Sequence, residues 1–255
     1  MKKSILLSVS LFFIMCCLPP AEAVDLYKTE YKCFDTKGNE RWSATTEVML
    51  TVDGISFDIF EIIEKASGTY GGFDERISWE TILELKEEKD DVKPVKMEKR
   101  IFDKNGKLII RDLQEFDFSK NTVTLKRENL VTGKKEEKAF VFEGDIVNRP
   151  FLATYIQKML GKGETQKSVY MITDKPRLYR MNIRVEGEKK IEIDARSVTA
   201  HKIQIEPDLG IFNVFKFILP KMYMWHMGKP RFEWLKYAGP ESTIKSPEVV
   251  MIRGK

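Results

Sequence analysis

Cysteine and histidine, which most often carry metal and nucleophile chemistry, are scarce in this chain of 255 residues. It has three cysteines and two histidines, and no His-x-His or His-Glu-x-x-His spacing occurs. Two of the cysteines lie in the first 23 residues, so only Cys33 belongs to the remainder, where a Cys/His zinc site lacks ligands. We therefore expect no metal, no cofactor and no intramolecular disulfide.

Sequence motifs of the common enzyme classes are also missing. There is no Gly-x-Ser-x-Gly elbow and no glycine-rich phosphate loop ending in Gly-Lys-Ser/Thr. Carboxylates are plentiful, but they recur at separated polar positions such as Glu61 and Glu64. The sequence predicts a protein that is not an enzyme, although two distant acids that meet in space would still form a glycosidase-type pair.

Charge of one sign does not accumulate anywhere in the chain. There are 43 lysines and arginines against 39 acids, a net charge of +4, and the two signs alternate, as in residues 134–138 and 186–190. A nucleic-acid-binding surface needs basic residues clustered without acids. We therefore exclude nucleic acid as a partner.

The first 23 residues have the three parts of a secretory signal peptide. Lys2 and Lys3 precede an apolar run at residues 4–18, and a small-x-small cleavage site lies at residues 21–23. The sequence thus predicts cleavage after Ala23 and export to the periplasm. Two alternatives stay open: an uncleaved membrane anchor, and a lipoprotein cleaved before Cys16, although Met15 is larger than the small residue expected there.

Most of the remaining chain consists of short segments in which apolar and polar residues alternate, separated by turn dipeptides. Asp53-Gly54 predicts a tight hairpin between residues 46–52 and 55–59, and a phase slip after Ile59 predicts a β-bulge or the end of pairing. Cys33 shares its phase with Tyr27 and Tyr31, so we expect a buried free thiol in a monomeric protein. Further strands are predicted at residues 77–85, 97–102, 108–111, 116–118, 123–125, 140–142, 168–173, 178–185, 190–194 and 198–206.

One helix interrupts these strands. Apolar residues recur at helical spacing over residues 151–160, Pro150 suits the first turn, and Gly161 ends the segment. We predict a mainly β fold: a curved antiparallel sheet, half-barrel or open barrel, with this helix packed on its concave face. Residues 24–255 form a single β-rich domain, whose one soft boundary is the charged stretch at 86–94.

Residues 211–237 differ from the rest because they are apolar on both alternating faces. Lys216, Pro220 and Lys221 exclude a membrane-spanning helix here. The segment is either a central strand covered by the helix or the lining of an apolar cavity. Phe212 and Phe215 also suit an amphipathic lid or a loop in peripheral contact with a membrane. The candidate ligand-binding residues are Phe212, Phe215, Met222, Met224, Trp225, Trp234 and Tyr237.

The layout of residues 95–250 resembles a bacterial periplasmic family of unknown function. The features that carry the resemblance are the Phe-Asp-Lys-Asn-Gly-Lys and Val-Thr-Gly-Lys turns, the helix, and a late hairpin with Trp225, Pro230, Tyr237, Gly239 and Pro240. That family is similar to the superfamily of periplasmic lipoprotein carriers, whose half-open β-barrel wraps a helix and holds acyl chains. The resemblance implies an open barrel and a lipid-type ligand, and it brings no catalytic residue.

These observations predict a non-catalytic binding protein of the cell envelope for an apolar or amphipathic ligand, such as a lipid or a lipoprotein acyl chain. The alternative is a structural or adaptor protein that docks a cell-envelope partner. An envelope hydrolase that uses an unrecognised carboxylate pair is the third interpretation.

Overall fold

The computed structural model describes residues 22–52, 59–71, 73–88, 91–173, 176–193, 195–210, 219–229, 231–242 and 246–254. The predicted signal peptide lies almost entirely outside these residues. The elements are β1 (Glu22–Asp35), β2 (Glu40–Val52), β3 (Ile59–Gly68), β4 (Ile77–Glu88), β5 (Asp91–Phe102), β6 (Leu108–Asp117), β7 (Thr122–Asn129), β8 (Lys134–Val141), β9 (Ile146–Asn148), α1 (Arg149–Gly161), β10 (Gln166–Ile172), β11 (Leu178–Ile193), β12 (Arg196–Pro207), β13 (Met222–Met227), β14 (Trp234–Pro240) and β15 (Glu248–Arg253).

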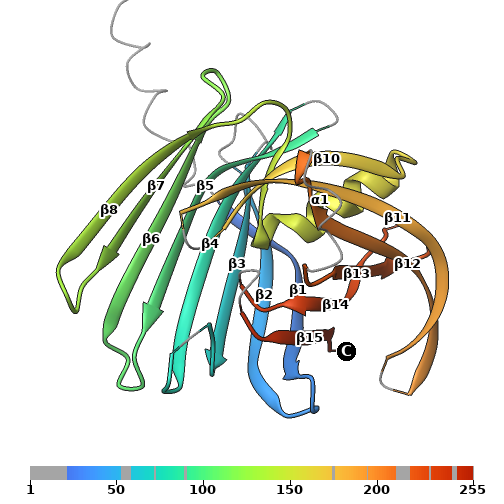
Figure 1. Ribbon diagram of the computed structural model, residues 1–255, viewed down its shortest axis with the longest axis horizontal. Coiled ribbons are helices and arrows are strands. Elements are labelled where there is room, and N and C mark those ends of the chain that lie inside the picture. The colour runs from blue at the N-terminus through green and yellow to red at the C-terminus, as the bar shows by residue number, and fades with distance from the viewer. Residues whose placement is uncertain are drawn as a thin grey trace, which may run out of the picture.

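All fifteen described strands belong to one sheet, in the order β8-β7-β6-β5-β4-β3-β2-β1-β15-β14-β13-β12-β11-β10-β9. Neighbouring strands are antiparallel except for β9 and β10, which are parallel. The sheet curves around α1 and does not close, because β8 and β9 are its two edges (Figure 1). The prediction of a curved, mainly antiparallel open barrel with one helix on its concave face is confirmed.

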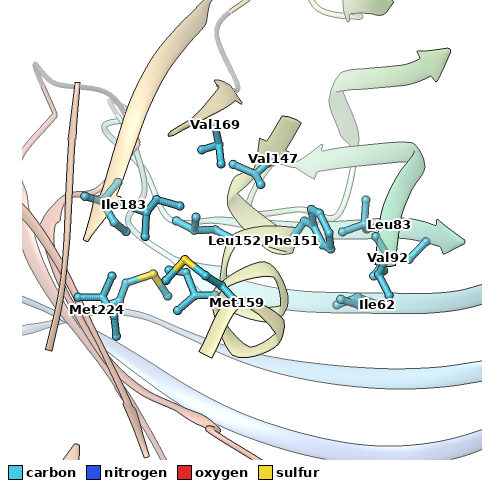
Figure 2. Close-up of a cluster of buried hydrophobic side chains, with 14 of the residues drawn as sticks. Ile62, Leu83, Val92, Val147, Phe151, Leu152, Met159, Val169, Ile183 and Met224 are labelled. Atoms are coloured by element: carbon cyan, nitrogen blue, oxygen red, sulfur yellow. The ribbon is translucent and has the colours of Figure 1, made fainter. Parts of the chain in front are cut away.

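Helix α1 is held between two arms of the curved sheet. The first arm consists of β1 to β8, and the second arm consists of β9 to β15. Its first turn is capped by Asn148, whose side chain accepts a hydrogen bond from the backbone N–H of Phe151 at 3.1 Å. Buried residues of the helix contact both arms (Figure 2). Ile62 and Leu83 come from one arm and Met224 comes from the other, so the helix is the centre of the largest apolar cluster.

Two further apolar clusters complete the core. One is aromatic and lies where β1 to β6 and β15 meet, with Trp42 and Trp79 almost fully buried in edge contact at 5.2 Å. The other joins Val123 of β7 to Ile172 of β10. The two ends of the sheet are therefore brought together by side chains and not by a hydrogen-bonded ladder.

Cys33 is a buried free thiol, as the alternation predicted, with no measurable exposure. Burial raises its pKa to about 12. Tyr31 shares the inward face. Tyr27 keeps the same phase, because the register shift of β1 lies before it, and its side chain faces the concave side with Thr29 although it is 49% exposed.

Three local predictions are wrong. Thr51 pairs with Ile59, which leaves more residues between the two strands than the two-residue turn predicted at Asp53-Gly54 allows. Residues 53–58 lie outside the described part of the chain. The phase slip after Ile59 gives no bulge, because β3 pairs without a register shift on both sides. Two strands predicted separately, at residues 178–185 and from residue 190, belong to one strand, β11, which ends at Ile193 and has a bulge between Val185 and Gly187.

The stretch at residues 86–94 is not a boundary in the sheet. Strands β4 and β5 pair across it, from Glu88 with Asp91 onwards. Pro94 is accommodated because the register shifts beside it, as is usual for proline inside a sheet. In the part of the chain that the structure describes, no helix has the length and apolar character needed to cross a membrane.

Candidate functional site

A cavity of about 560 Å³ lies between α1 and the concave face of the sheet. Its size is within the roughly 300–1,000 Å³ of ordinary ligand pockets. One face of the helix contributes side chains from Arg149 to Gln157, and strands of both arms supply the remaining lining. The cavity therefore lies against α1, the helix at the centre of the largest apolar cluster.

The first arm contributes a straight row of polar side chains, which we call the polar row. Its members face one another across successive strands β1 to β5 and all line the cavity: Thr29, Thr46, Glu64, Thr81 and Lys99. Because side chains alternate between the two faces of a strand, this register places all five on the concave face.

The polar row separates two apolar clusters. In β4, Thr81 is 2% exposed and lies between buried Trp79, of the aromatic cluster, and buried Leu83, of the helix cluster. In β5, Lys99 has the same position between Met97 and Ile101. The row is thus a polar band across an otherwise apolar concave face.

Glu64 is the acidic member of the polar row. Its carboxylate accepts hydrogen bonds from the Tyr31 hydroxyl and from the indole N–H of Trp79, the latter at 2.9 Å. Burial and the neighbouring Glu64 raise the pKa of Tyr31 well above its ordinary value. Tyr31 therefore stays protonated and continues to donate to Glu64 at physiological pH.

Two cations meet at one end of the cavity. The Lys99 ammonium and the Arg149 guanidinium both donate to the hydroxyl oxygen of Tyr70, at 3.3 and 3.1 Å. Arg149 is the first residue of α1, and its guanidinium lies 5.5 Å from the centre of the Trp42 ring. It also donates to the backbone carbonyl of Glu241 at 2.7 Å.

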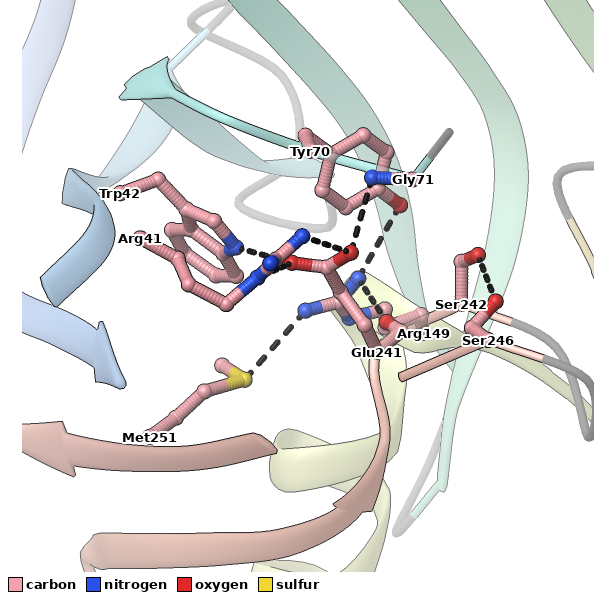
Figure 3. A network of polar contacts seen from close by, with 9 residues as sticks. All are labelled: Arg41, Trp42, Tyr70, Gly71, Arg149, Glu241, Ser242, Ser246 and Met251. Carbon is pink, nitrogen blue, oxygen red and sulfur yellow. Dashed lines mark hydrogen bonds and ion pairs between the residues drawn. The ribbon is translucent and has the colours of Figure 1, made fainter. Parts of the chain in front are cut away.

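The Glu241 side chain lies beside Arg149 (Figure 3) and is fully buried. Its carboxylate accepts two hydrogen bonds from Arg41, at 3.0 and 3.2 Å. The indole N–H of Trp42 and the backbone N–H of Gly71 each donate to it at 2.8 Å. Four donors satisfy this carboxylate, so its role here is to fix the neighbouring strands.

The apolar part of the lining is rich in methionine. Four methionines of the second arm, from β10, β11 and β13, form what we call the methionine wall: Met171, Met181, Met222 and Met224. Met97 and Met251 also line the cavity, which makes six of the eleven methionines in the chain. Unbranched, polarisable thioether side chains adapt to apolar ligands of irregular shape.

At the other end of the lining, side chains of α1, β1 and β15 form polar contacts. Gln157 of α1 donates to the backbone carbonyl of Arg231, which has a φ of 91°. The Arg253 guanidinium pairs with Glu233 at 2.7 Å and donates to Thr29 at 2.8 Å. The cavity thus has charged groups at both ends of its helix face.

Four of the seven residues proposed from the sequence line this cavity: Met222, Met224, Trp234 and Tyr237. The Tyr237 hydroxyl donates to the carbonyl of Pro240 at 2.7 Å. Phe212 and Phe215 lie outside the described residues.

The placement of Trp225 on the cavity is wrong. It has the opposite phase of β13 from Met224 and faces away from the helix, where it lies 6.0 Å from Tyr223 and 5.3 Å from the Lys236 ammonium. Since both faces of this strand are apolar in the sequence, alternation alone did not say which face meets the helix.

Sequence reasoning missed the polar row and Arg149. A usable signal was present, because Thr81 and Lys99 interrupt the buried phase of otherwise apolar strands. The other signal was an arginine at the first position of the single predicted helix. Neither pattern shows by itself that residues on β1 to β5 and α1 meet at one cavity.

Among the residues that the structure describes, no group of three or more His, Cys, Asp or Glu side chains could hold a metal ion. His226 is fully buried, and its Nδ1 lies 2.7 Å from the carbonyl oxygen of Phe232. Burial lowers the pKa of His226 to about 4, so the imidazole is neutral.

No family model and no curated protein matches this sequence. One similar solved structure is a β-barrel-like protein of a domain of unknown function, DUF1849, from Brucella abortus. The two chains share 7% identity over 89% of this chain and 95% of that chain, with a TM-score of 0.49. No residue of the site is assigned from this likeness.

Proposed function

We propose that the protein is a non-catalytic binding protein of the cell envelope for an amphipathic ligand that has a hydrocarbon chain. The observation that carries the proposal is the composition of the cavity, in which the methionine wall and the polar row line the same space. A ligand with a hydrocarbon chain and a polar group matches both. The predicted signal peptide and the resemblance to periplasmic lipoprotein carriers support the location and the ligand class.

The free energy of binding would come mainly from removing the hydrocarbon chain from water. Each methylene group buried contributes about 0.8 kcal/mol, before the cost of ordering the ligand is subtracted. Met222 and Met171 are only partly buried, so their side chains have room to rearrange around a chain. Hydrogen-bonding groups of the polar row would bind the ligand's polar atoms.

Filling the cavity tests this proposal. Ala153 lines the cavity from α1 and is partly exposed, so Ala153→Trp adds bulk there without removing a core side chain. The matched control is Ala139→Trp on edge strand β8, where Ala139 is exposed and away from the cavity. Binding of an apolar fluorescent probe, and its displacement by a fatty acid, would be measured for the unmodified protein and both variants.

We expect near-stoichiometric probe binding by the unmodified protein and by Ala139→Trp, and none by Ala153→Trp. Circular dichroism and thermal melting confirm that both variants are folded. If the folded, unmodified protein binds neither the probe nor a fatty acid, the cavity is only a packing feature. The adaptor interpretation would then replace the carrier interpretation.

A further inference from the structure

Three neighbouring members of the polar row form a group of oxygen-bearing side chains on the wall of the cavity. Glu64 of β3 pairs with Thr46 of β2 on one side and with Thr81 of β4 on the other, and all three line the cavity. Side chains that are directly opposed in antiparallel strands have Cβ atoms about 4.5–5.5 Å apart. A carboxylate is therefore flanked by a hydroxyl on each side, at a spacing that one polar headgroup can bridge.

The carboxylate of Glu64 has room for further hydrogen bonds. The Tyr31 hydroxyl donates to its Oε2, and the indole N–H of Trp79 donates to its Oε1 at 2.9 Å. An ionised carboxylate has about four lone-pair sites, so each oxygen keeps a site for one more donor. Both of these donors are neutral groups, and a charged acceptor makes stronger hydrogen bonds than a neutral one. Two adjacent donors of a ligand would therefore find a strong acceptor here.

Charges of both signs surround this carboxylate in the lining. Glu233 and Glu241 add negative charge, and Lys99 and Arg149 add positive charge. An anionic headgroup at Glu64 would meet a like charge at once. A cationic headgroup would approach Lys99, two strands along the same row, and Arg149. Uncharged donors avoid both penalties, and the hydroxyl group is the donor that also accepts hydrogen bonds.

We propose that the ligand is an uncharged amphiphile whose headgroup carries adjacent hydroxyl groups, as a sugar or a glycerol unit does, and that these hydroxyls bind Glu64. The inference rests on the proposed binding function and specifies its ligand class. Two neighbouring hydroxyls of the headgroup donate to the two oxygens of the carboxylate. The hydroxyls of Thr46 and Thr81, which can donate and accept, lie beside them.

The neighbours of Glu64 orient the rest of the molecule. In β3, Ile62 lines the cavity and belongs to the helix cluster, whereas Ala66, on the other side of Glu64, is buried in the aromatic cluster. The hydrocarbon chain therefore leaves on the Ile62 side, toward the helix cluster that also includes the methionine wall. The rings of Tyr31 and Trp234, in edge contact at 5.5 Å, line the cavity beside the headgroup and can pack against its C–H groups.

The inference is tested with amphiphiles that share a dodecyl chain. Dodecyl glucoside and the dodecyl ether of glycerol carry adjacent hydroxyls, and their matched control is the ether analogue that lacks the middle hydroxyl of the glycerol unit. Dodecanoate and dodecyltrimethylammonium test a negative and a positive headgroup. Each compound is titrated, below its micelle concentration, against the protein loaded with the apolar fluorescent probe.

We expect dodecyl glucoside and the glycerol ether to displace the probe at about tenfold lower concentration than the analogue, as fits one further hydrogen bond to a charged acceptor. Dodecanoate and dodecyltrimethylammonium should both bind more weakly than these two compounds. The tighter of the two identifies the sugar or the glycerol unit as the better headgroup.

Two variants locate the effect at the polar row. Glu64→Gln should abolish most of the tenfold difference between the glycerol ether and its analogue, because a glutamine side chain has no charge and offers a single acceptor oxygen. Thr81→Val removes a hydroxyl but keeps the shape of the side chain, and it should weaken binding of the glycerol ether several-fold. The matched control is Thr45→Val, because Thr45 has the opposite phase of β2 from Thr46 and is not part of the cavity lining; it should leave the difference unchanged.

The possible results separate the inference from the function beneath it. Equal displacement by the glycerol ether and its analogue would overturn the hydroxyl site while leaving the binding function intact. Tighter binding of dodecanoate or dodecyltrimethylammonium than of the glucoside and the glycerol ether would do the same. Failure of all the compounds to displace or replace the probe would count against the binding function itself. The amphiphile series on the unmodified protein decides the question even if Glu64→Gln does not fold.

Discussion

Arg41 and Glu241 lie 200 positions apart in the sequence, and their side chains form a two-point ion pair in the middle of the sheet (Figure 3). The pair joins β2 to the residue that follows β14. Arg41 is partly exposed, whereas the Glu241 side chain is fully buried. The carboxylate therefore depends on its protein donors for all of its solvation.

Glu241→Gln should destabilise the protein strongly. The glutamine amide carries no charge to pair with Arg41, and its NH2 group would face the hydrogen-bond donors that surround the native carboxylate. Breaking a buried ion pair typically costs about 3–5 kcal/mol. Urea unfolding measures the free energy of unfolding. The control is Glu47→Gln, in an exposed pair with Lys28, which should leave the free energy of unfolding nearly unchanged because exposed ion pairs are screened by water. Equal effects in the two variants would refute the structural role given to Glu241.

Stability should fall in mild acid because of His226. Its pKa in the folded protein is about 4, below the ordinary value of 6.5, because burial disfavours the charged ring. The unfolded chain binds the proton more readily, so this contribution is complete above pH 6.5 and is lost as the pH falls toward 4. The loss amounts to about 3 kcal/mol. Urea unfolding between pH 7 and 4 should show this slope, and His226→Gln should lack it.

The thiol of Cys33 should be inert in the native protein. Burial raises its pKa to about 12, so almost no thiolate exists at pH 8, and the reagent has no access. In the chain processed after Ala23, a colorimetric thiol reagent should react with one thiol per chain only after denaturant is added. Rapid native reaction, or a dimer that reducing agent dissociates, would show that the strand carrying Cys33 opens.

The two tryptophans of the late hairpin should respond differently to a ligand. Trp234 lines the cavity, whereas Trp225 lies on the outer face beside Lys236. An apolar quenching probe should therefore lose most of its effect in Trp234→Phe and keep it in Trp225→Phe. Equal quenching in both variants would place the probe outside the cavity.

Processing should occur after Ala23. The prediction rests on the apolar run that follows Lys2 and Lys3 and on the small-x-small site at residues 21–23. Intact-mass measurement of exported protein checks it. The expected mature chain begins at Val24. A mass that corresponds to an acylated chain beginning at Cys16 or Cys17 would contradict it and would mean that the protein is membrane-tethered.

Local features of the fold follow well from the sequence. Period-two alternation placed Cys33 and Tyr31 inward, and helical spacing located α1 to within two residues. These predictions succeed because they depend on neighbouring residues. The pairing of β1 with β15 depends on the path of the whole chain, and no local pattern specifies it.

The cavity was only partly predictable for the same reason. Met224 and Trp234 were identified because their segment is apolar on both faces, but the error at Trp225 came from not knowing which face met the helix. Lys99 and Arg149 belong to separate elements whose meeting point is set by the curvature of the sheet. A polar residue at an inward position of a strand is the local signal that deserves more weight in such chains.

Because β1 and β15 are neighbours in the sheet, the sheet can be completed only late in the synthesis and folding of the chain. Thr29 and Arg253, 224 positions apart, are hydrogen-bonded across this seam, so β1 gains its second neighbour only after residues 36–247 have been synthesised. Contacts of such long sequence separation slow folding. Met251 and Arg253 also line the cavity, so the lining of the cavity is complete only once β15 has been synthesised. A chain that still lacks β15 therefore has neither the finished sheet nor the complete lining of the cavity.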